Sequence, residues 1–184
     1  LMVPFPLAQK DVVTRFQLPQ KLYGRDAEIQ TLLAAFHRAA DPQQGAVELV
    51  LVTGSAGIGK TSLIREIHKP ITVRRGYFIA GKFDQLHRTP YAALIHAFQE
   101  LVNQILTENE AQISLWRQKL LAALGRNGQV IVDVIPTVAL IIGPQTAVPD
   151  LPPAEAENRF TLAFQNFMRV FAQADHPLVL FLDD

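Results

Sequence analysis

The chain has 184 residues, of which 49% are hydrophobic, so it carries enough apolar material for one domain with its own core. Its 17 Lys and Arg residues balance 17 Asp and Glu residues, which removes any electrostatic case for a nucleic-acid or membrane partner. The absence of cysteine excludes disulfides and thiolate metal sites and is compatible with the cytoplasmic location that we predict.

The first 40 residues divide into a linker and a helix. Residues 1–20 contain three prolines among polar residues, which is typical of a linker. From residue 26 to about residue 40, apolar side chains recur at helical spacing, beginning at Ile29 and reaching Phe36. We therefore predict a linker over residues 1–20 and a domain over residues 21–184.

A glycine-rich segment follows a run that is typical of a β-strand, residues 48–53. Residues 54–61 read GSAGIGKT and fit G-x-x-x-x-G-K-[ST], the phosphate-binding P-loop, and residues 62–67 predict a helix after it. Glycines let the backbone wrap around a triphosphate because they tolerate positive φ and carry no Cβ. The alternative is a turn that merely joins a strand to a helix, but such a turn has no use for Lys60 and Thr61 at its end.

The P-loop pattern gives each part of the segment a role. Lys60 is expected to bridge the β- and γ-phosphates and to act in catalysis, and the Thr61 hydroxyl is expected to ligate Mg²⁺. Backbone amides and the start of the following helix add partial positive charge. The residues of this segment expected to contact the nucleotide are Gly54, Ser55, Ala56, Gly57, Ile58, Gly59, Lys60, Thr61 and Ser62.

Helical patterns fill most of the chain between a second expected strand, residues 76–81, and a third near the C-terminal end. Thr89 and Pro90 predict the start of one of these helices. Residues 127–143 contain a run that suits a strand, but Pro136 and the helical neighbours favour short buried helices, with Asp133 at a solvent-facing edge.

A long helix is expected from the proline-rich turn at residues 149–153 to about residue 174. It carries a stripe of phenylalanines at helical spacing: Phe160, Phe164, Phe167 and Phe171. The stripe predicts a core face packed on a sheet. The alternative is a groove that binds a partner.

The chain ends with an apolar run, residues 178–182, followed by Asp183 and Asp184. Such a run is typical of a strand buried on both faces of a parallel sheet, and ligands bind at the C-terminal ends of such strands. Downstream of a P-loop this is the Walker B pattern. We expect Asp183 to hold Mg²⁺ through water and Asp184 to orient and deprotonate the attacking water. The alternative is acidic residues that end a strand in a turn.

Residues 22–28, LYGRDAE, resemble the hydrophobic-hydrophobic-Gly-Arg-x-x-Glu motif ahead of the P-loop in AAA+ ATPases of the STAND (signal-transduction ATPase) type. Residues 81–84 and 158–160 add to this likeness, which extends from Phe16 to Asp184. It implies ATP and Mg²⁺ as cofactors, with adenine-side contacts from Tyr23, Gly24 and Arg25. The alternative for Arg25 is a salt bridge to Glu28 in the first turn of the helix.

The resemblance also implies an α/β fold with a parallel sheet of order 5-1-4-3-2 and a large helical insertion between strands 2 and 3. The chain stops at the Walker B strand, so strands 4 and 5, the sensor-1 residue, the arginine finger and the lid are expected to be missing. The strand at residues 48–53 then lacks its neighbours. We expect residues 21–184 to be the N-terminal part of the ATPase domain, cut from a longer polypeptide, and to be poorly stable and at best weakly catalytic alone.

In the proteins that it resembles, large bacterial and especially cyanobacterial sensors, this module lies between a Ser/Thr-kinase-like domain and later GAF and histidine-kinase domains. The resemblance implies a nucleotide switch that binds ATP and hydrolyses it slowly, with those domains as partners and self-association that depends on nucleotide. Alternatives are a scaffold that binds nucleotide without hydrolysis and a replication-initiator-like ATPase acting on DNA. Lys82, Asp84 and Arg88 either face the γ-phosphate region or, as the favoured interpretation, are solvated loop charges.

Overall fold

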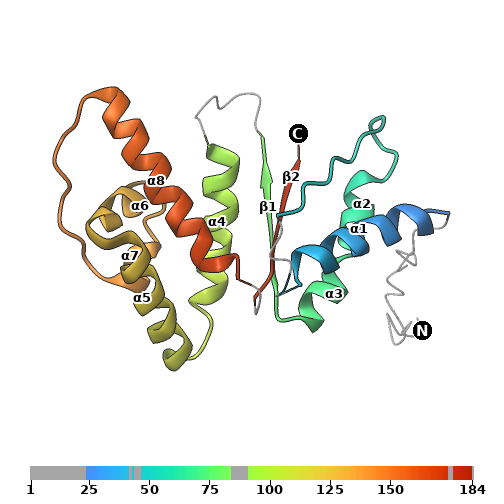
Figure 1. Ribbon diagram of the computed structural model, residues 1–184, viewed down its shortest axis with the longest axis horizontal. Coiled ribbons are helices and arrows are strands. Elements are labelled where there is room, and N and C mark those ends of the chain that lie inside the picture. The colour runs from blue at the N-terminus through green and yellow to red at the C-terminus, as the bar shows by residue number, and fades with distance from the viewer. Residues whose placement is uncertain (1–23, 42, 44–46, 84–90, 174–175, 184) are drawn as a thin grey trace, which may run out of the picture.

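The computed structural model describes residues 24–41, 43, 47–83, 91–173 and 176–183. A small parallel sheet lies in the middle of this part of the chain, with helices on both of its faces (Figure 1). In it, β1 (Tyr77–Lys82) pairs with β2 (Leu178–Asp183), and Tyr77 lies opposite Leu178. The protein is therefore an α/β structure. The predicted linker, residues 1–20, lies outside the described residues.

The helices fall into two groups, one on each side of the sheet. On one side lie α1 (Asp26–Ala39), α2 (Lys60–Arg65) and α3 (His68–Val73). On the other side lie α4 (Ala92–Ile105), α5 (Glu110–Leu124), α6 (Gly128–Val134), α7 (Val138–Ile142) and α8 (Pro153–Phe171), with a short 3₁₀ turn at Gly125–Asn127. The second group forms the crossover that two parallel strands need, and the predicted helical insertion between these strands is present.

Local sequence explains where several helices begin. The Asn109 side chain caps α5 by accepting a hydrogen bond from the Gln112 amide at 3.0 Å. Pro153 opens α8, where its fixed φ suits the first helical position. The predicted start of α4 at Thr89 and Pro90 lies outside the described residues.

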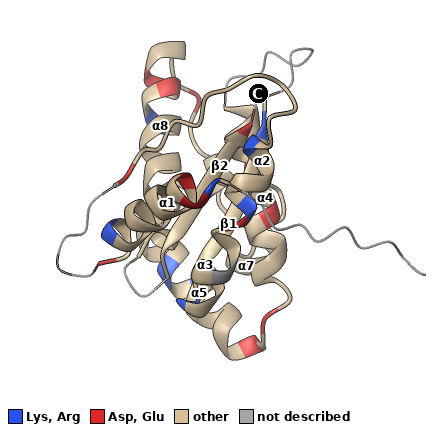
Figure 2. Cartoon of the chain, turned by 90° about the vertical axis from the view of Figure 1, so that its right-hand side faces the viewer, with Lys and Arg blue, Asp and Glu red and all other residues tan. Residues whose placement is uncertain are grey.

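Each face of the sheet covers its own hydrophobic core, because alternate strand residues point in opposite directions. Ile79 packs into the larger core with α4 to α8, whereas Phe78, Val179 and Phe181 pack against a smaller core of α1 to α3. No charged residue of the described part is buried. Figure 2 shows charges of both signs scattered over the surface rather than gathered in one field.

The phenylalanine stripe is a core face, as predicted, and its ring contacts are with helices that lie over the sheet. The rings of Phe164, Phe167 and Phe171 lie 5.9, 5.6 and 6.0 Å from the ring of Phe98 on α4, and Phe171 also lies 5.4 Å from Trp116 on α5. Ile79 of β1 belongs to the same core, and Leu178 and Leu180 of β2 pack against it. Rings at these distances stabilise a core beyond their area alone.

The predicted strand at residues 48–53 is wrong: the backbone there is irregular, although the sequence has strong strand propensity. Val47, Leu49 and Leu51 are 98%, 94% and 85% exposed. A strand forms only where a neighbour satisfies its amides and carbonyls, and no described segment pairs with this one.

The prediction of short helices over residues 127–143 is confirmed, because α6 and α7 occupy this stretch. Apolar residues of both helices, among them Ile131 and Ile141, are fully buried. Asp133 is exposed, as predicted, and accepts a hydrogen bond from Gln129 at 2.7 Å.

A cluster of polar groups joins the start of β1 to the helical side. The Tyr77 hydroxyl donates to one oxygen of Glu108 at 3.1 Å, and the Trp116 indole donates to the other at 3.2 Å. Burial, together with the charge of Glu108 and this hydrogen bond, raises the pKa of Tyr77 well above its ordinary value.

We expect Tyr77→Phe to lower the free energy of unfolding by about 1 kcal/mol at neutral pH, because Glu108 loses one donor. The pH dependence has a definite sign. The pKa of Tyr77 is higher in the folded state than in the unfolded state, where it is about 10. The stabilisation from Tyr77 is therefore complete below about pH 10 and is lost as the pH rises above that value. Urea unfolding followed by Trp116 fluorescence should show the wild-type stability falling more steeply than that of the variant between pH 9 and pH 11.

Tyr91→Phe is the matched control, because the Tyr91 hydroxyl makes no hydrogen bond within the described residues. A loss in Tyr91→Phe equal to that in Tyr77→Phe would contradict the role of Glu108.

Candidate functional site

The predicted P-loop has the backbone that its glycines permit. Gly57 and Gly59 have φ angles of 78° and 95°, a left-handed region that strains any other side chain. α2 begins at the next residue, Lys60, and the carbonyl of Gly59 accepts the first turn's hydrogen bond from Leu63 at 3.0 Å. The two glycines are therefore needed by the turn that starts the helix.

The ammonium group of Lys60 lies within this loop. Its Nζ donates to the carbonyl oxygens of Gly54 at 3.0 Å and Ser55 at 3.4 Å. The first amides of α2 have no acceptor one turn earlier inside the helix, so they are free to bind a ligand from that side. These features together fit a polyphosphate: the loop has no Cβ atoms at its turns, and it offers a lysine and unused amides.

A cavity of about 360 Å³ lies between the α2–α3 side and the sheet. Its lining consists of Thr61, Ile64, Arg65, His68, Phe78, Ala80, Gly81, Lys82, Phe181 and Asp183. Thr61 and Asp183, the two predicted metal ligands, are far apart in the chain but line this one space. Hydroxyl and carboxylate oxygens are the ligands that Mg²⁺ takes from proteins, so the donor set fits the predicted ion.

The strand pairing explains how Asp183 reaches the cavity. Asp183 ends β2 directly opposite Lys82, which ends β1. The amide of Phe83 donates to the Asp183 carbonyl at 2.8 Å, so the pairing continues one residue beyond the strand. Because C-terminal ends of parallel strands share one edge of a sheet, Asp183 and Lys82 lie side by side at that edge.

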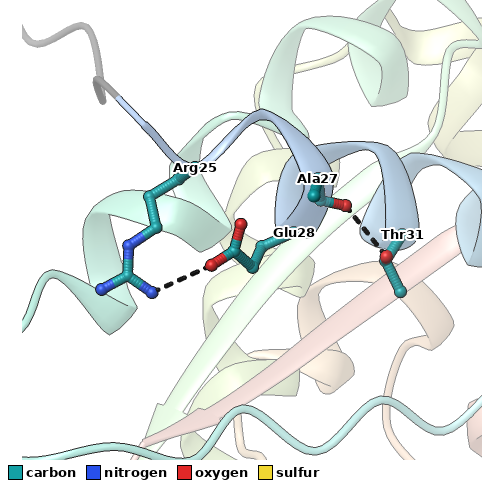
Figure 3. Close-up of polar contacts among 4 residues, drawn as sticks. All are labelled: Arg25, Ala27, Glu28 and Thr31. Carbon is teal, nitrogen blue, oxygen red and sulfur yellow. Dashed lines mark hydrogen bonds and ion pairs between the residues drawn. The ribbon is translucent and has the colours of Figure 1, made fainter.

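Arg25 makes the ion pair that was the alternative to an adenine contact. Its Nη1 lies 3.2 Å from Oε1 of Glu28, and both side chains are partly exposed (Figure 3). In the same turn, the Thr31 hydroxyl donates to the Ala27 carbonyl at 2.9 Å. An exposed pair of this kind contributes little to stability, so it leaves Arg25 available for other contacts.

Of the other predicted site residues, the structure describes Gly24 but not the four that are named below. Gly24 is exposed and has a φ of 74°. Tyr23, Asp84, Arg88 and Asp184 lie outside the described residues.

An ion pair that the sequence did not reveal anchors the segment before the loop. Arg38, in the last turn of α1, donates to both carboxylate oxygens of Glu48, from Nε at 2.7 Å and from Nη2 at 3.0 Å. The hydrogen bond from Arg38 lowers the pKa of Glu48, and the bond to Glu48 raises that of Arg38. Two such residues show no shared spacing in the sequence, so only the fold brings them together.

A larger open groove of about 660 Å³ lies between α5 and α8, on the other side of the sheet, and contains none of the predicted site residues. Its polar lining includes Lys119, Asn166 and Arg169. No helix of the described part is long and apolar enough to cross a bilayer.

Residues 21–184 match the AAA ATPase domain family, and the chain therefore belongs to that family. The chain is 42% identical over 180 residues to hybrid signal transduction histidine kinase G of Dictyostelium discoideum, covering 98% of this chain and 5% of that protein. It is also 33% identical over 72 residues to the peroxide stress-activated histidine kinase mak3 of Schizosaccharomyces pombe, covering 39% of this chain and 3% of that protein. No solved structure gives a significant match.

These comparisons agree with the resemblance drawn from the sequence: the chain is an AAA-type ATPase region similar to part of large signal-transduction kinases. The chain spans about one twentieth of the first relative's length.

We expect Gly59→Ala to destabilise the loop by about 1 kcal/mol or more, because alanine is strained at its positive φ. Thermal unfolding of the full-length natural protein should show a lower midpoint for Gly59→Ala than for wild type. Ser55→Ala is the control from the same loop, since it has no positive φ, and it should unfold like wild type. Equal midpoints for Gly59→Ala and wild type would contradict the observed loop conformation.

Proposed function

We propose that this chain binds ATP with Mg²⁺ and that the protein carrying it hydrolyses the nucleotide slowly, as a switch of the STAND type in signal transduction. The observation that supports this most is the meeting of Thr61 and Asp183 in one cavity, next to the loop that holds Lys60. The family supports ATPase chemistry in general terms, and the kinase relative supports a place in signalling.

Each residue has a distinct task in this proposal. Lys60 leaves its two carbonyl partners and neutralises the β- and γ-phosphates. Thr61 and Asp183 hold Mg²⁺, Asp183 through water, and Asp184 orients and deprotonates the attacking water. When bound, Mg²⁺ neutralises charge on the β- and γ-phosphate oxygens. Residues 54–62 supply the loop contacts, and Tyr23, Gly24 and Arg25 lie beside the adenine.

The proposal extends to the domain architecture of this chain. We propose that residues 21–184 are the N-terminal part of the domain, that β1 and β2 are strands 2 and 3 of a sheet of order 5-1-4-3-2, and that residues 1–20 form a linker. The proposed partners are kinase-like, GAF and histidine-kinase domains of the same polypeptide, in the cytoplasm, with self-association that depends on nucleotide.

Lys60→Ala in the full-length natural protein should weaken MgATP binding by at least about 30-fold, because removing a charge from a desolvated contact costs about 2–5 kcal/mol. Isothermal titration calorimetry measures this directly. Lys119→Ala, on α5 and away from the loop, is the control and should bind like wild type. Unchanged affinity in Lys60→Ala would remove the loop from the site.

Asp184→Asn should leave MgATP affinity close to that of wild type and lower phosphate release by about 10²–10⁴-fold, because an amide cannot accept the proton of the attacking water. A coupled phosphate assay on the full-length protein checks the rate. Comparable turnover in Asp184→Asn would exclude Asp184 as the base. Tight ATP binding without phosphate release from wild type would instead favour the scaffold that binds nucleotide without hydrolysis.

A further inference from the structure

We propose that Lys82 is a further phosphate-contacting residue of this site and that it makes the site prefer ATP to ADP. This inference rests on the proposed function and extends it. The sequence favoured a solvated loop charge for Lys82. In the structure the side chain is exposed, as expected, but Lys82 is the last residue of β1 rather than a loop residue, and it lines the cavity.

The register of the sheet fixes the position of Lys82. It lies directly opposite Asp183 in the parallel pair. Neighbouring strands of a sheet lie about 5 Å apart. The Lys82 side chain therefore starts from the strand position next to the carboxylate that we expect to hold Mg²⁺, within reach of a ligand bound there.

Strand alternation places Lys82 on the face that the site uses. Phe78, Ala80 and Lys82 all line the cavity, as alternate residues of one strand do. Thr61 lines the same cavity from α2. An ion held between Thr61 and Asp183 would bring the β- and γ-phosphates to this edge of the sheet.

The Lys82 side chain is exposed and makes no ion pair or hydrogen bond within the described residues. A lysine with a flexible stem and an uncommitted ammonium group is suited to follow a phosphate that is present in ATP and absent in ADP. In this proposal, Lys60 contacts both phosphates from the loop, whereas Lys82 contacts the γ-phosphate from the end of β1, opposite Asp183.

The other basic groups of the cavity are placed differently. Arg65 follows Thr61 by one turn of α2, and so lies farther from the start of that helix. The ring of His68 lies 4.0 Å from that of Phe78, nearer the middle of β1. Lys82 is the basic residue of this lining that ends a strand beside Asp183.

The test compares MgATP and MgADP binding to the full-length natural protein by isothermal titration calorimetry. Lys82→Met keeps the aliphatic stem and removes the charge. We expect it to weaken MgATP binding about tenfold or more while MgADP binding stays within about twofold, so that the preference for ATP falls about tenfold. Lys82→Arg, which keeps the charge, should retain most of the preference.

Arg65→Met is the matched control, because it removes a positive charge from the same cavity without removing a neighbour of Asp183. It should change both affinities by the same factor. A fall in the ATP preference of Arg65→Met as large as that of Lys82→Met would show a general effect of charge and overturn the specific role of Lys82.

MgATP binding by the wild-type protein separates a failure of the proposed function from a failure of the role of Lys82. If wild-type protein does not bind MgATP, the proposed function is wrong. If it does and Lys82→Met keeps the wild-type preference, or loses both ligands equally with an unchanged circular dichroism spectrum, the inference about Lys82 is wrong. Should Lys82→Met unfold, Lys82→Gln provides the same comparison with a polar neutral side chain, and an unchanged preference there has the same meaning.

Discussion

The parallel pairing of β1 with β2 is the constraint on which the candidate site depends. Parallel strands cannot be joined by a tight turn, so a long crossover must return the chain to the same edge. Here α4 to α8 form that crossover and bury a core of their own. A shift of β2 by one residue against β1 would turn Asp183 to the opposite face, away from Lys82 and Thr61. The helical half thus holds the register that brings the carboxylate, the lysine and the hydroxyl into one cavity.

The parts of the site that depend on local sequence were predictable. Glycines at 57 and 59 adopt the positive φ angles that the P-loop pattern requires, and Lys60 lies inside the turn that its spacing predicts. The short helices at residues 127–143 also follow from local rules, since Pro136 interrupts what propensity alone would make a strand. Local signals also set the start of α5, at the Asn109 cap, and of α8, at Pro153.

Features that depend on partners distant in the chain were not predictable. Residues 48–53 have strand propensity, but propensity cannot provide the neighbouring strand that makes one. The phenylalanine stripe was correctly predicted as a core face, yet its covering helices α4 and α5 could not be read from spacing. The position of Lys82 is a further example: the sequence suggested a loop, and only the fold shows that Lys82 ends a strand opposite Asp183 and lines the same cavity.

Because the sheet separates the two cores, a bound ligand would stabilise one side of the fold more than the other. Anything that binds only the folded site stabilises, by mass action, the unit that must be ordered to hold it. That unit is the smaller one, built from α1 to α3 and one face of the strands. Cooperative units of this kind open locally with different free energies. Ligand binding would therefore slow amide hydrogen exchange chiefly in α1 to α3 and across β1 and β2. The deepest amides of α4 to α8 would keep the exchange rate that they have without ligand. The strands, which pack against both cores, are then the boundary between the part of the fold that ligand binding stabilises and the part that it leaves unchanged.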